Sequence, residues 1–213
     1  MKVFISADIE GVTDVTHWDE TEINRPGYNE AREQMTAEVL AACEGALEAG
    51  AKEIWVRDAH DSASNLLPHK LPKMARLIRG WSPHPMMMME HLDASFTAAV
   101  MIGYHSRAAQ NTSPLAHTMS TDFVRVSLNG RDVSEFWLNT LAAELAGVPV
   151  VFVSGDGGLC REVAELNGNI STLAVKEGYG NSTVNIHPQL AVEQIKAGVF
   201  SALNGHLSLC RVT

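Results

Sequence analysis

The chain has 213 residues, enough for one large domain with a well-buried core. Apolar residues make up 46% of it and charged residues 19%, so the composition excludes disordered and fibrous proteins. A formal net charge of -9 argues against a surface for nucleic acid or for an anionic membrane, and is more compatible with metal cofactors.

The first predicted element is a short apolar strand, residues 3–7, which leads into two carboxylates one residue apart. Side chains alternate faces along a strand, so Asp8 and Glu10 point the same way, and Gly11 permits a sharp turn just beyond them. Two converging acids repel each other unless a cation lies between them. On this stretch alone a merely polar strand exit is the favoured interpretation, and a metal site is the alternative.

A polar loop over residues 12–26 follows, and such a loop could cover a site. Apolar residues at helical spacing then predict a helix over residues 28–49, which ends at Gly50. The next predicted strand, residues 53–57, runs into Asp58-Ala59-His60-Asp61. A second strand therefore ends in polar residues.

Two prolines, Pro68 and Pro72, interrupt regular structure before a predicted short edge strand at residues 75–78. The strand predicted over residues 96–104 leads into His105, so a polar residue again follows a strand. Residues 123–128 then meet Asn129-Gly130, a dipeptide preferred in type I′ turns, which predicts a local antiparallel hairpin.

Strands and helices alternate in the remainder of the chain. Ser134 is expected to cap a helix that extends to residue 146, with Glu135 in its first turn. The residues expected to face inward on this helix are Leu138, Leu141, Ala142 and Leu145. Residues 150–153 and 170–175 are predicted strands, and residues 159–166 and 188–203 are predicted helices. The alternation predicts an α/β fold, a mostly parallel sheet with helices on both faces, in three layers, plus the local hairpin.

Ligands in such sheets bind at the carboxyl ends of the strands. Five residues with metal-binding types of side chain follow predicted strands: Asp8, Glu10, Asp58, His60 and His105. Imidazole suits zinc, and a carboxylate can bridge two ions. Two zinc ions about 3.5–4 Å apart could activate a shared water and polarise a carbonyl, as amide hydrolysis requires. Glu135 could add a ligand, although a carboxylate that favours the helix dipole is an equally good interpretation.

Separated motifs, in order and in spacing, resemble the zinc-dependent D-aminopeptidases of the DppA type. They are Ser6-Ala7-Asp8-Ile9-Glu10-Gly11, Asp58-Ala59-His60-Asp61, Gly103-Tyr104-His105-Ser106-Arg107-Ala108, His117-Thr118-Met119-Ser120, and Asn129-Gly130-Arg131 before Glu135. The resemblance covers residues 1–203, which are expected to form a single metallohydrolase domain. The short tail at residues 204–213 looks unlike the family, whose members continue further.

The resemblance implies a dinuclear centre with two Zn2+ ions per subunit. Its implied protein ligands are Asp8 as the bridge, Glu10 and His60 on one ion, and His105 and Glu135 on the other. His117 is the implied catalytic residue, as a proton shuttle or as a nucleophile. The implied activity releases amino-terminal D-residues from short peptides or amides, in a large ring-like homo-oligomer such as a decamer. The alternatives are a related metal-dependent amidase or peptidase without D-selectivity, and a catalytically silent truncated subunit.

Other features are given less specific interpretations. Three widely spaced cysteines and the absence of an export signal predict a cytoplasmic protein. Asp58 and Asp61 are expected to orient His60 rather than to bind metal. The run of methionines at residues 86–89 is expected to pack as apolar filler, and Gly155-Asp156-Gly157-Gly158 to form a tight turn near the site. Six further histidines are expected on solvated loops and caps: His17, His69, His84, His91, His187 and His206.

Overall fold

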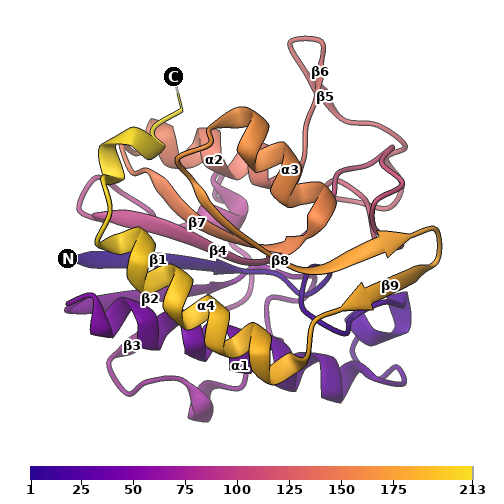
Figure 1. Cartoon of the computed structure of the whole chain (residues 1–213), viewed down its shortest axis with the longest axis horizontal. Coiled ribbons are helices and arrows are strands. Elements are labelled where there is room, and N and C mark those ends of the chain that lie inside the picture. The colour runs from indigo at the N-terminus through magenta and orange to yellow at the C-terminus, as the bar shows by residue number, and fades with distance from the viewer. Residues whose placement is uncertain (213) are drawn as a thin grey trace.

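A seven-stranded sheet with the strand order β3-β2-β1-β4-β7-β8-β9 forms the centre of the protein (Figure 1). The computed structural model describes residues 1–212, so Thr213, the last residue of the predicted tail, lies outside the described residues. The strands are β1 (Lys2–Ala7), β2 (Glu53–Asp58), β3 (Ala75–Ile78), β4 (Ala98–Tyr104), β7 (Val150–Asp156), β8 (Ser171–Tyr179) and β9 (Ser182–Asn185). Neighbouring strands in this sheet run parallel, except that β9 is antiparallel to β8.

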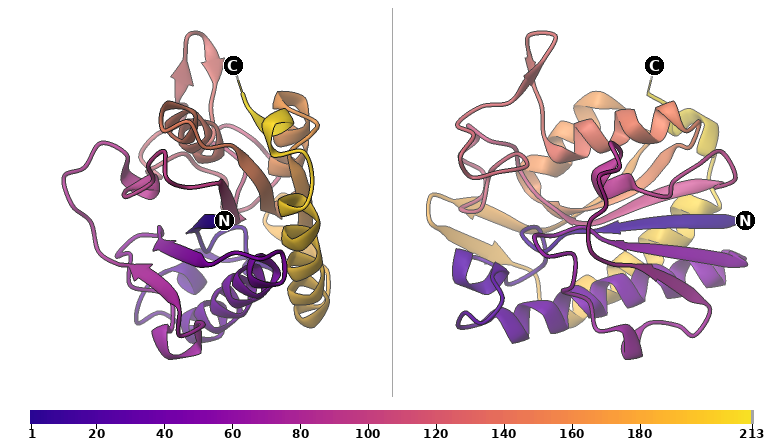
Figure 2. Two further views of the ribbon diagram at one scale, coloured as in Figure 1. Left: turned by 90° about the vertical axis from the view of Figure 1, so that its left-hand side faces the viewer. Right: turned by 180° about the vertical axis from the view of Figure 1, so that it is seen from behind.

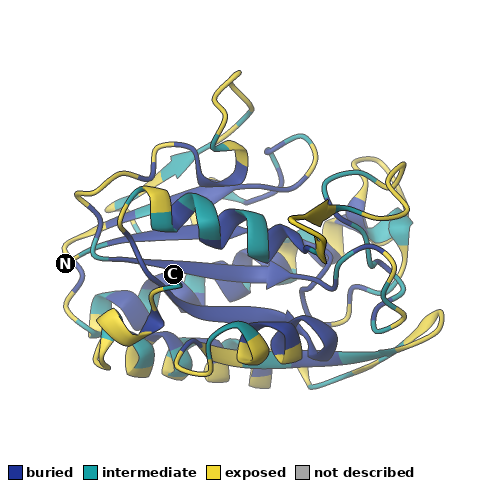
Figure 3. Ribbon diagram, turned by 90° about the horizontal axis from the view of Figure 1, so that it is seen from above, coloured by how far each residue is buried: buried dark blue, intermediate teal, exposed yellow. Residues whose placement is uncertain are grey.

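Helices cover both faces of the sheet, which confirms the predicted three-layer α/β fold (Figure 2). The helices α1 (Tyr28–Glu48) and α4 (Pro188–Leu203) pack together on one face, and α2 (Glu135–Leu145) and α3 (Gly157–Leu166) cover the other. The central strands β1, β4 and β7 are buried between these layers, while the outer surfaces of the helices are exposed (Figure 3). Gly45 allows the close packing of α1 on α4, because an added Cβ there would lie 2.4 Å from the Lys196 carbonyl oxygen.

The strand order reverses at β1, which lies between β2 and β4. Ala7 at the end of β1 is in register with Asp58 on β2 and with Ile102 on β4, so the three strands end close together. Open α/β sheets bind their ligands at this kind of reversal. The turn after β1 packs directly on the end of β4, since a Cβ on Gly11 would lie 1.7 Å from the Tyr104 carbonyl oxygen.

The hairpin predicted from Asn129-Gly130 forms between β5 (Ser127–Leu128) and β6 (Arg131–Asp132). Both turn residues have positive φ angles, 52° and 81°, as a type I′ turn requires. The first strand is shorter than the predicted 123–128, and Val124 is 85% exposed. The hairpin projects away from the main sheet (Figure 1).

Two features of the fold differ from the prediction. β9 was not predicted, although Gly180-Asn181, which joins it to β8, is a dipeptide of the hairpin-turn type. The inward face predicted for α2 is wrong except at Ala142, which packs against the core: Leu145 is 86% exposed. The residues that α2 buries are Glu135, Phe136, Asn139, Thr140 and Ala143. Apolar residues lie on several sides of this helix, so the positions of its leucines did not identify the buried face. Glu135 and Asn139 lie on that buried face and make polar contacts there.

Short 3-10 helices occupy several loops. They are η1 (Trp18–Thr21), η2 (Pro68–Lys70), η3 (Met87–Met89) and η4 (Leu207–Cys210). The last of these lies in the predicted tail and places Cys210 against the core. Within residues 1–212, no helix combines the length and the apolar character needed to cross a bilayer.

Candidate metal centre

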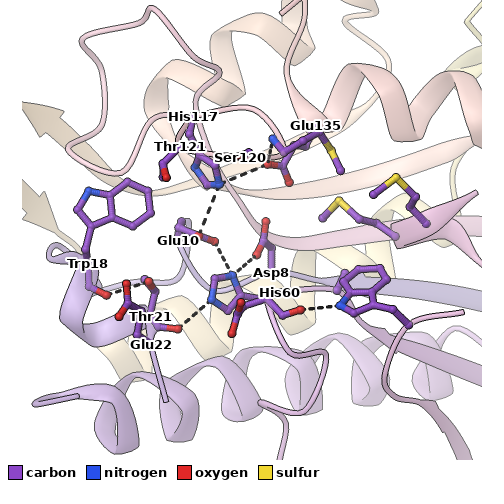
Figure 4. Close-up of a pocket in the computed structure, with 16 residues that line it drawn as sticks. Asp8, Glu10, Trp18, Thr21, Glu22, His60, His117, Ser120, Thr121 and Glu135 are labelled. Atoms are coloured by element: carbon purple, nitrogen blue, oxygen red, sulfur yellow. Dashed lines mark hydrogen bonds and ion pairs between the residues drawn. The ribbon is translucent and has the colours of Figure 1, made fainter. Parts of the chain in front are cut away.

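The six residues singled out from the sequence come together beyond the ends of β1, β2 and β4. Asp8 and Glu10 follow β1, His60 follows β2, His105 follows β4, His117 lies in the loop before β5, and Glu135 begins α2. Figure 4 labels all of them except His105, and their side chains converge on one cavity. The sheet topology therefore brings together residues that are up to 127 positions apart, from Asp8 to Glu135.

Asp8 lies between two histidines. Its Oδ1 is 3.2 Å from Nδ1 of His60, and its Oδ2 is 3.5 Å from Nε2 of His105. A second carboxylate faces each of these nitrogens: Glu10 Oε2 is 3.1 Å from His60, and Glu135 Oε1 is 3.5 Å from His105. The site thus consists of two carboxylate and histidine clusters that share Asp8.

Each imidazole is oriented by a backbone carbonyl. The contacts are His60 Nε2 to Thr21 O at 2.9 Å, His105 Nδ1 to Ser106 O at 2.9 Å, and His117 Nδ1 to Leu115 O at 3.0 Å. With the proton on the nitrogen that faces the carbonyl, the other nitrogen of each ring faces the carboxylates. Metal-binding histidines are commonly oriented in this way.

The cluster is deeply buried, with Asp8 and Glu10 each 2% exposed. Burial raises the pKa of Asp8, but hydrogen bonds with His105 and His60 outweigh it, and the net pKa is below its ordinary range. Burial lowers the pKa of His105 and of His60, but the surrounding carboxylates outweigh it and raise the pKa of both well above the ordinary value. The field that holds protons on these rings would equally attract a divalent cation, whose binding releases the protons.

The residues present fit zinc. Glu10 Oε2 and His105 Nε2 are buried, and among residues 1–212 they have only the imidazole and carboxylate contacts given above and no well-aligned hydrogen bond, a costly condition that a bound cation would relieve. Three sets of ligand atoms lie within 4.8 Å of one another: Asp8, Glu10 and His60; Asp8, His105 and Glu135; Glu10, His105 and His117. Carboxylate oxygens and imidazole nitrogens are ordinary zinc ligands. The first two sets share Asp8 and coincide with the two ligand sets implied by the sequence resemblance.

His117 lines the same cavity as most of the proposed ligands and packs against two other rings. Its side chain is 12% exposed, and its Nε2 lies 3.6 Å from Glu135 Oε1 and 3.9 Å from Glu10 Oε1. Its ring stacks on the ring of His105. The rings of His117 and Trp18 pack in a T-shaped arrangement, with their centroids 5.3 Å apart. His117 is therefore held in place while one nitrogen faces the site.

The cavity above these residues has a volume of about 510 Å³, within the range of small-molecule sites. Its lining includes Asp8, Glu10, His60, His117 and Glu135, together with Trp18, Trp81, Met87 and Met119. Met87, which is 46% exposed, and Met88 both line the cavity, while Met89 is fully buried in the core, as predicted for the methionine run.

Asp58 and Asp61 do not orient the His60 ring, contrary to the prediction. In the described part of the chain, neither carboxylate hydrogen-bonds to that ring, which contacts Thr21 instead. Asp58 accepts hydrogen bonds from the backbone of Asn65 at 2.6 Å and of Leu66 at 2.8 Å, and thereby shapes the loop that carries His60. The prediction was wrong because it relied on the closeness of both acids to His60 in sequence. The group that orients the ring, the Thr21 carbonyl, belongs to a distant loop.

Two supporting residues were not identified from the sequence. Asp156 caps α3 by accepting from Leu159 N at 2.8 Å, and it also accepts from Ser106 N at 2.7 Å, which fixes the loop after His105. Asp156 could have been identified from the sequence, because an Asp directly before a helix start is a typical helix cap. Thr21 could not, because it contacts His60 through its backbone carbonyl and not through its side chain.

Comparisons with known proteins identify a family for this chain. The sequence matches the Peptidase_M55 family, described as D-aminopeptidase, over residues 1–213. It is 34% identical over 184 residues to the D-aminopeptidase of Bacillus subtilis (strain 168), covering 86% of this chain and 66% of that protein. The fold is similar to that of the "Zn-dependent D-aminopeptidase DppA from Bacillus subtilis, a self-compartmentalizing protease", with a TM-score of 0.89 and 31% identity over 96% of this chain and 74% of that chain. The chain thus spans about two thirds of the length of the curated relative.

Proposed function

The chain belongs to the D-aminopeptidase family, and we propose that it is a zinc-dependent aminopeptidase that removes amino-terminal D-residues from short peptides or amides. Asp8 carries this proposal, because its carboxylate joins two buried ligand sets, at 3.2 Å from His60 and at 3.5 Å from His105. A relative with 31% sequence identity is described as Zn-dependent, which supports zinc as the metal.

Two zinc ions per chain are proposed, each held by three protein ligands. One set is Asp8, Glu10 and His60, and the other is Asp8, His105 and Glu135. Zinc bound there would polarise the scissile carbonyl and lower the pKa of a water molecule. Trp18 and Met119 line the same cavity as the proposed ligands.

His117 is proposed as the proton-transfer residue. Its Nδ1 donates to the Leu115 carbonyl oxygen at 3.0 Å, so Nε2 carries the lone pair and faces the cavity. Nε2 can accept a proton from the attacking water and return it to the leaving amine. Glu10 and Glu135, with oxygens 3.9 Å and 3.6 Å away, stabilise the imidazolium that forms between these steps.

The decisive experiment compares D-alanyl and L-alanyl anilides as substrates of the purified chain, with zinc counted in the same samples. We expect about two zinc ions per chain, preferential cleavage of the D-compound, and activity that chelator removes and added zinc restores. Equal cleavage of both anilides would support the amidase without D-selectivity. Zinc-loaded protein that cleaves neither would identify a silent subunit, and chelator-resistant activity would contradict the metal mechanism.

A ring-like homo-oligomer in the cytoplasm, with a decamer as the specific candidate, completes the proposal. The solved relative is described as self-compartmentalizing. Leu138, Leu141 and Leu145 share a face of α2, and Leu145 is 86% exposed, which suits contact with a second copy. Light scattering should give about ten times the chain mass of 23.1 kDa, and a monomeric mass would contradict the assembly.

A further inference from the structure

Lys176 on β8 is buried, and its ammonium points into the turn that follows β1. Its Nζ donates to the backbone carbonyl oxygens of Glu10 at 2.5 Å, of Val12 at 3.0 Å, and of Val15. An ammonium has three N–H donors, and all three are matched by carbonyls of this one turn. Lys176 therefore occupies the position that a bound monovalent cation would take.

This arrangement is costly, which indicates that the turn depends on it. Lys176 is 2% exposed, and burial lowers its pKa to about 8 despite the acids around it. A buried ammonium loses its hydration, and only well-placed acceptors compensate for that loss. The acceptors here belong to a single turn and not to the strands beside Lys176.

The same turn is also hydrogen-bonded to α1 and to β8. The backbone N–H of Thr13 donates to Glu38 Oε1 at 3.0 Å, and the Thr13 hydroxyl contacts the Val175 carbonyl oxygen at 3.2 Å. Glu38 is fully buried. The turn is therefore hydrogen-bonded both to a buried acid, Glu38, and to a buried base, Lys176.

Residues at both ends of the turn belong to the metal centre. Glu10 is at its start, with Oε2 3.1 Å from His60. Beyond its end, η1 supplies the Thr21 carbonyl oxygen that lies 2.9 Å from His60 Nε2, and Trp18, which packs on His117. A displacement of the turn would therefore move Glu10 relative to His60. His105 and Glu135 come from other segments, β4 and α2.

We propose that Lys176 is a positioning residue for the metal centre: its ammonium acts as a built-in cation that fixes the Glu10 backbone, and thereby places the Glu10 carboxylate beside Asp8 and His60. This inference rests on the proposed zinc centre. It requires the ligand set with Glu10 to depend on Lys176, and the set with His105 and Glu135 to be largely independent of it.

The test measures zinc affinity at the two positions in Lys176→Ala and Lys176→Met, by competition with a chelator. Loss of a supporting contact should weaken one position by about 10- to 100-fold and leave the other near wild type. Propylammonium should restore the weakened position in Lys176→Ala by filling the vacated space, while tetramethylammonium, which has no N–H donor, should not. Lys176→Met keeps the volume and serves if the alanine variant does not fold.

Lys196→Ala is the matched control, because Lys196 forms surface ion pairs with Glu44 and Glu48 and should leave both zinc affinities unchanged. Equal weakening of both positions in the Lys176 variants, wild-type affinities, or no rescue by propylammonium would overturn the proposal. Amide exchange over residues 11–16 in the metal-free protein should be faster in Lys176→Met. That readout separates the two proposals: a wild type that binds no zinc refutes the zinc function, while unchanged exchange refutes the role of Lys176.

Discussion

The imidazole rings of His105 and His117 are stacked, with centroids 4.3 Å apart and planes 5° from parallel. The parallel stack fixes the plane of the His117 ring. Together with the contact from Nδ1 to the Leu115 carbonyl oxygen at 3.0 Å, it keeps Nε2 on the side of Glu10 and Glu135. The stack therefore joins a proposed metal ligand to the residue proposed for proton transfer.

Replacing His117 with alanine should remove proton transfer without removing the metal. We expect kcat to fall by about 10²- to 10⁴-fold, because that is the usual contribution of a positioned general base. The zinc content should stay at the wild-type value, since neither set that shares Asp8 includes His117. Steady-state kinetics and zinc analysis on the same preparation test this, and a parallel loss of zinc would make His117 a ligand instead.

Asp8→Ala and Glu10→Ala should differ in how much zinc they lose. Asp8 belongs to both ligand sets that it joins, so its removal should empty both positions. Glu10 belongs to only one of these two sets, and its removal should weaken mainly that position. Zinc counts on the two variants, with the exposed Asp122→Ala as control, decide the matter. Equal losses would show that Asp8 is not the bridge.

Gly11→Ala should destabilise the protein because the added methyl group has no space. Its carbon would lie 1.7 Å from the backbone oxygen of Tyr104, which cannot move without disturbing β4. We expect a loss of about 1–3 kcal/mol or more in the free energy of unfolding. Gly168→Ala is the matched control, since its nearest heavy atom would be 3.8 Å away. Urea unfolding curves should separate the two variants, and equal stabilities would contradict this account of the turn.

Glu38→Gln should change the pH dependence of stability. Burial raises the pKa of Glu38 from 4.5 to about 7 in the folded protein. Because the folded-state value is above the unfolded one, the stabilising effect is complete below pH 4.5 and is lost as the pH rises to about 7. The loss is up to about 3 kcal/mol, from about 1.4 kcal/mol per pKa unit.

Glutamine is neutral throughout, so the Glu38→Gln variant should gain stability relative to the wild type over this interval. Unfolding in urea, in the presence of chelator to exclude zinc linkage, measures the difference at each pH. Two stability curves that stay parallel between pH 4.5 and 7 would refute the prediction.

Much of the site could be predicted because its residues occupy local positions with a clear signal. Asp8, His60 and His105 each follow a strand, and parallel strands bring their carboxyl ends to one edge. Glu135 was ambiguous from position alone, and the role of His117 was implied only by the family resemblance. Their placement depends on how the loop before β5 and the start of α2 return to the sheet.

Other parts of the site had no local signal. Lys176 lies in the middle of β8, where a lysine indicates a solvent-exposed position, and its acceptors are at least 161 residues away in sequence. The α2 leucines indicated the wrong buried face for a related reason. Phe136 is buried because of where the helix docks, and an apolar pattern spread around a helix does not specify that direction.

The bond between Lys176 and the Glu10 carbonyl also bears on the order in which the protein is made. It joins positions 166 residues apart, while the six residues of the proposed site lie between Asp8 and Glu135. A ribosome therefore completes all of those side chains before it synthesises β8. A nascent chain of that length has the ligands but lacks the ammonium that holds the turn, so we expect metal loading to follow synthesis of the second half of the sheet.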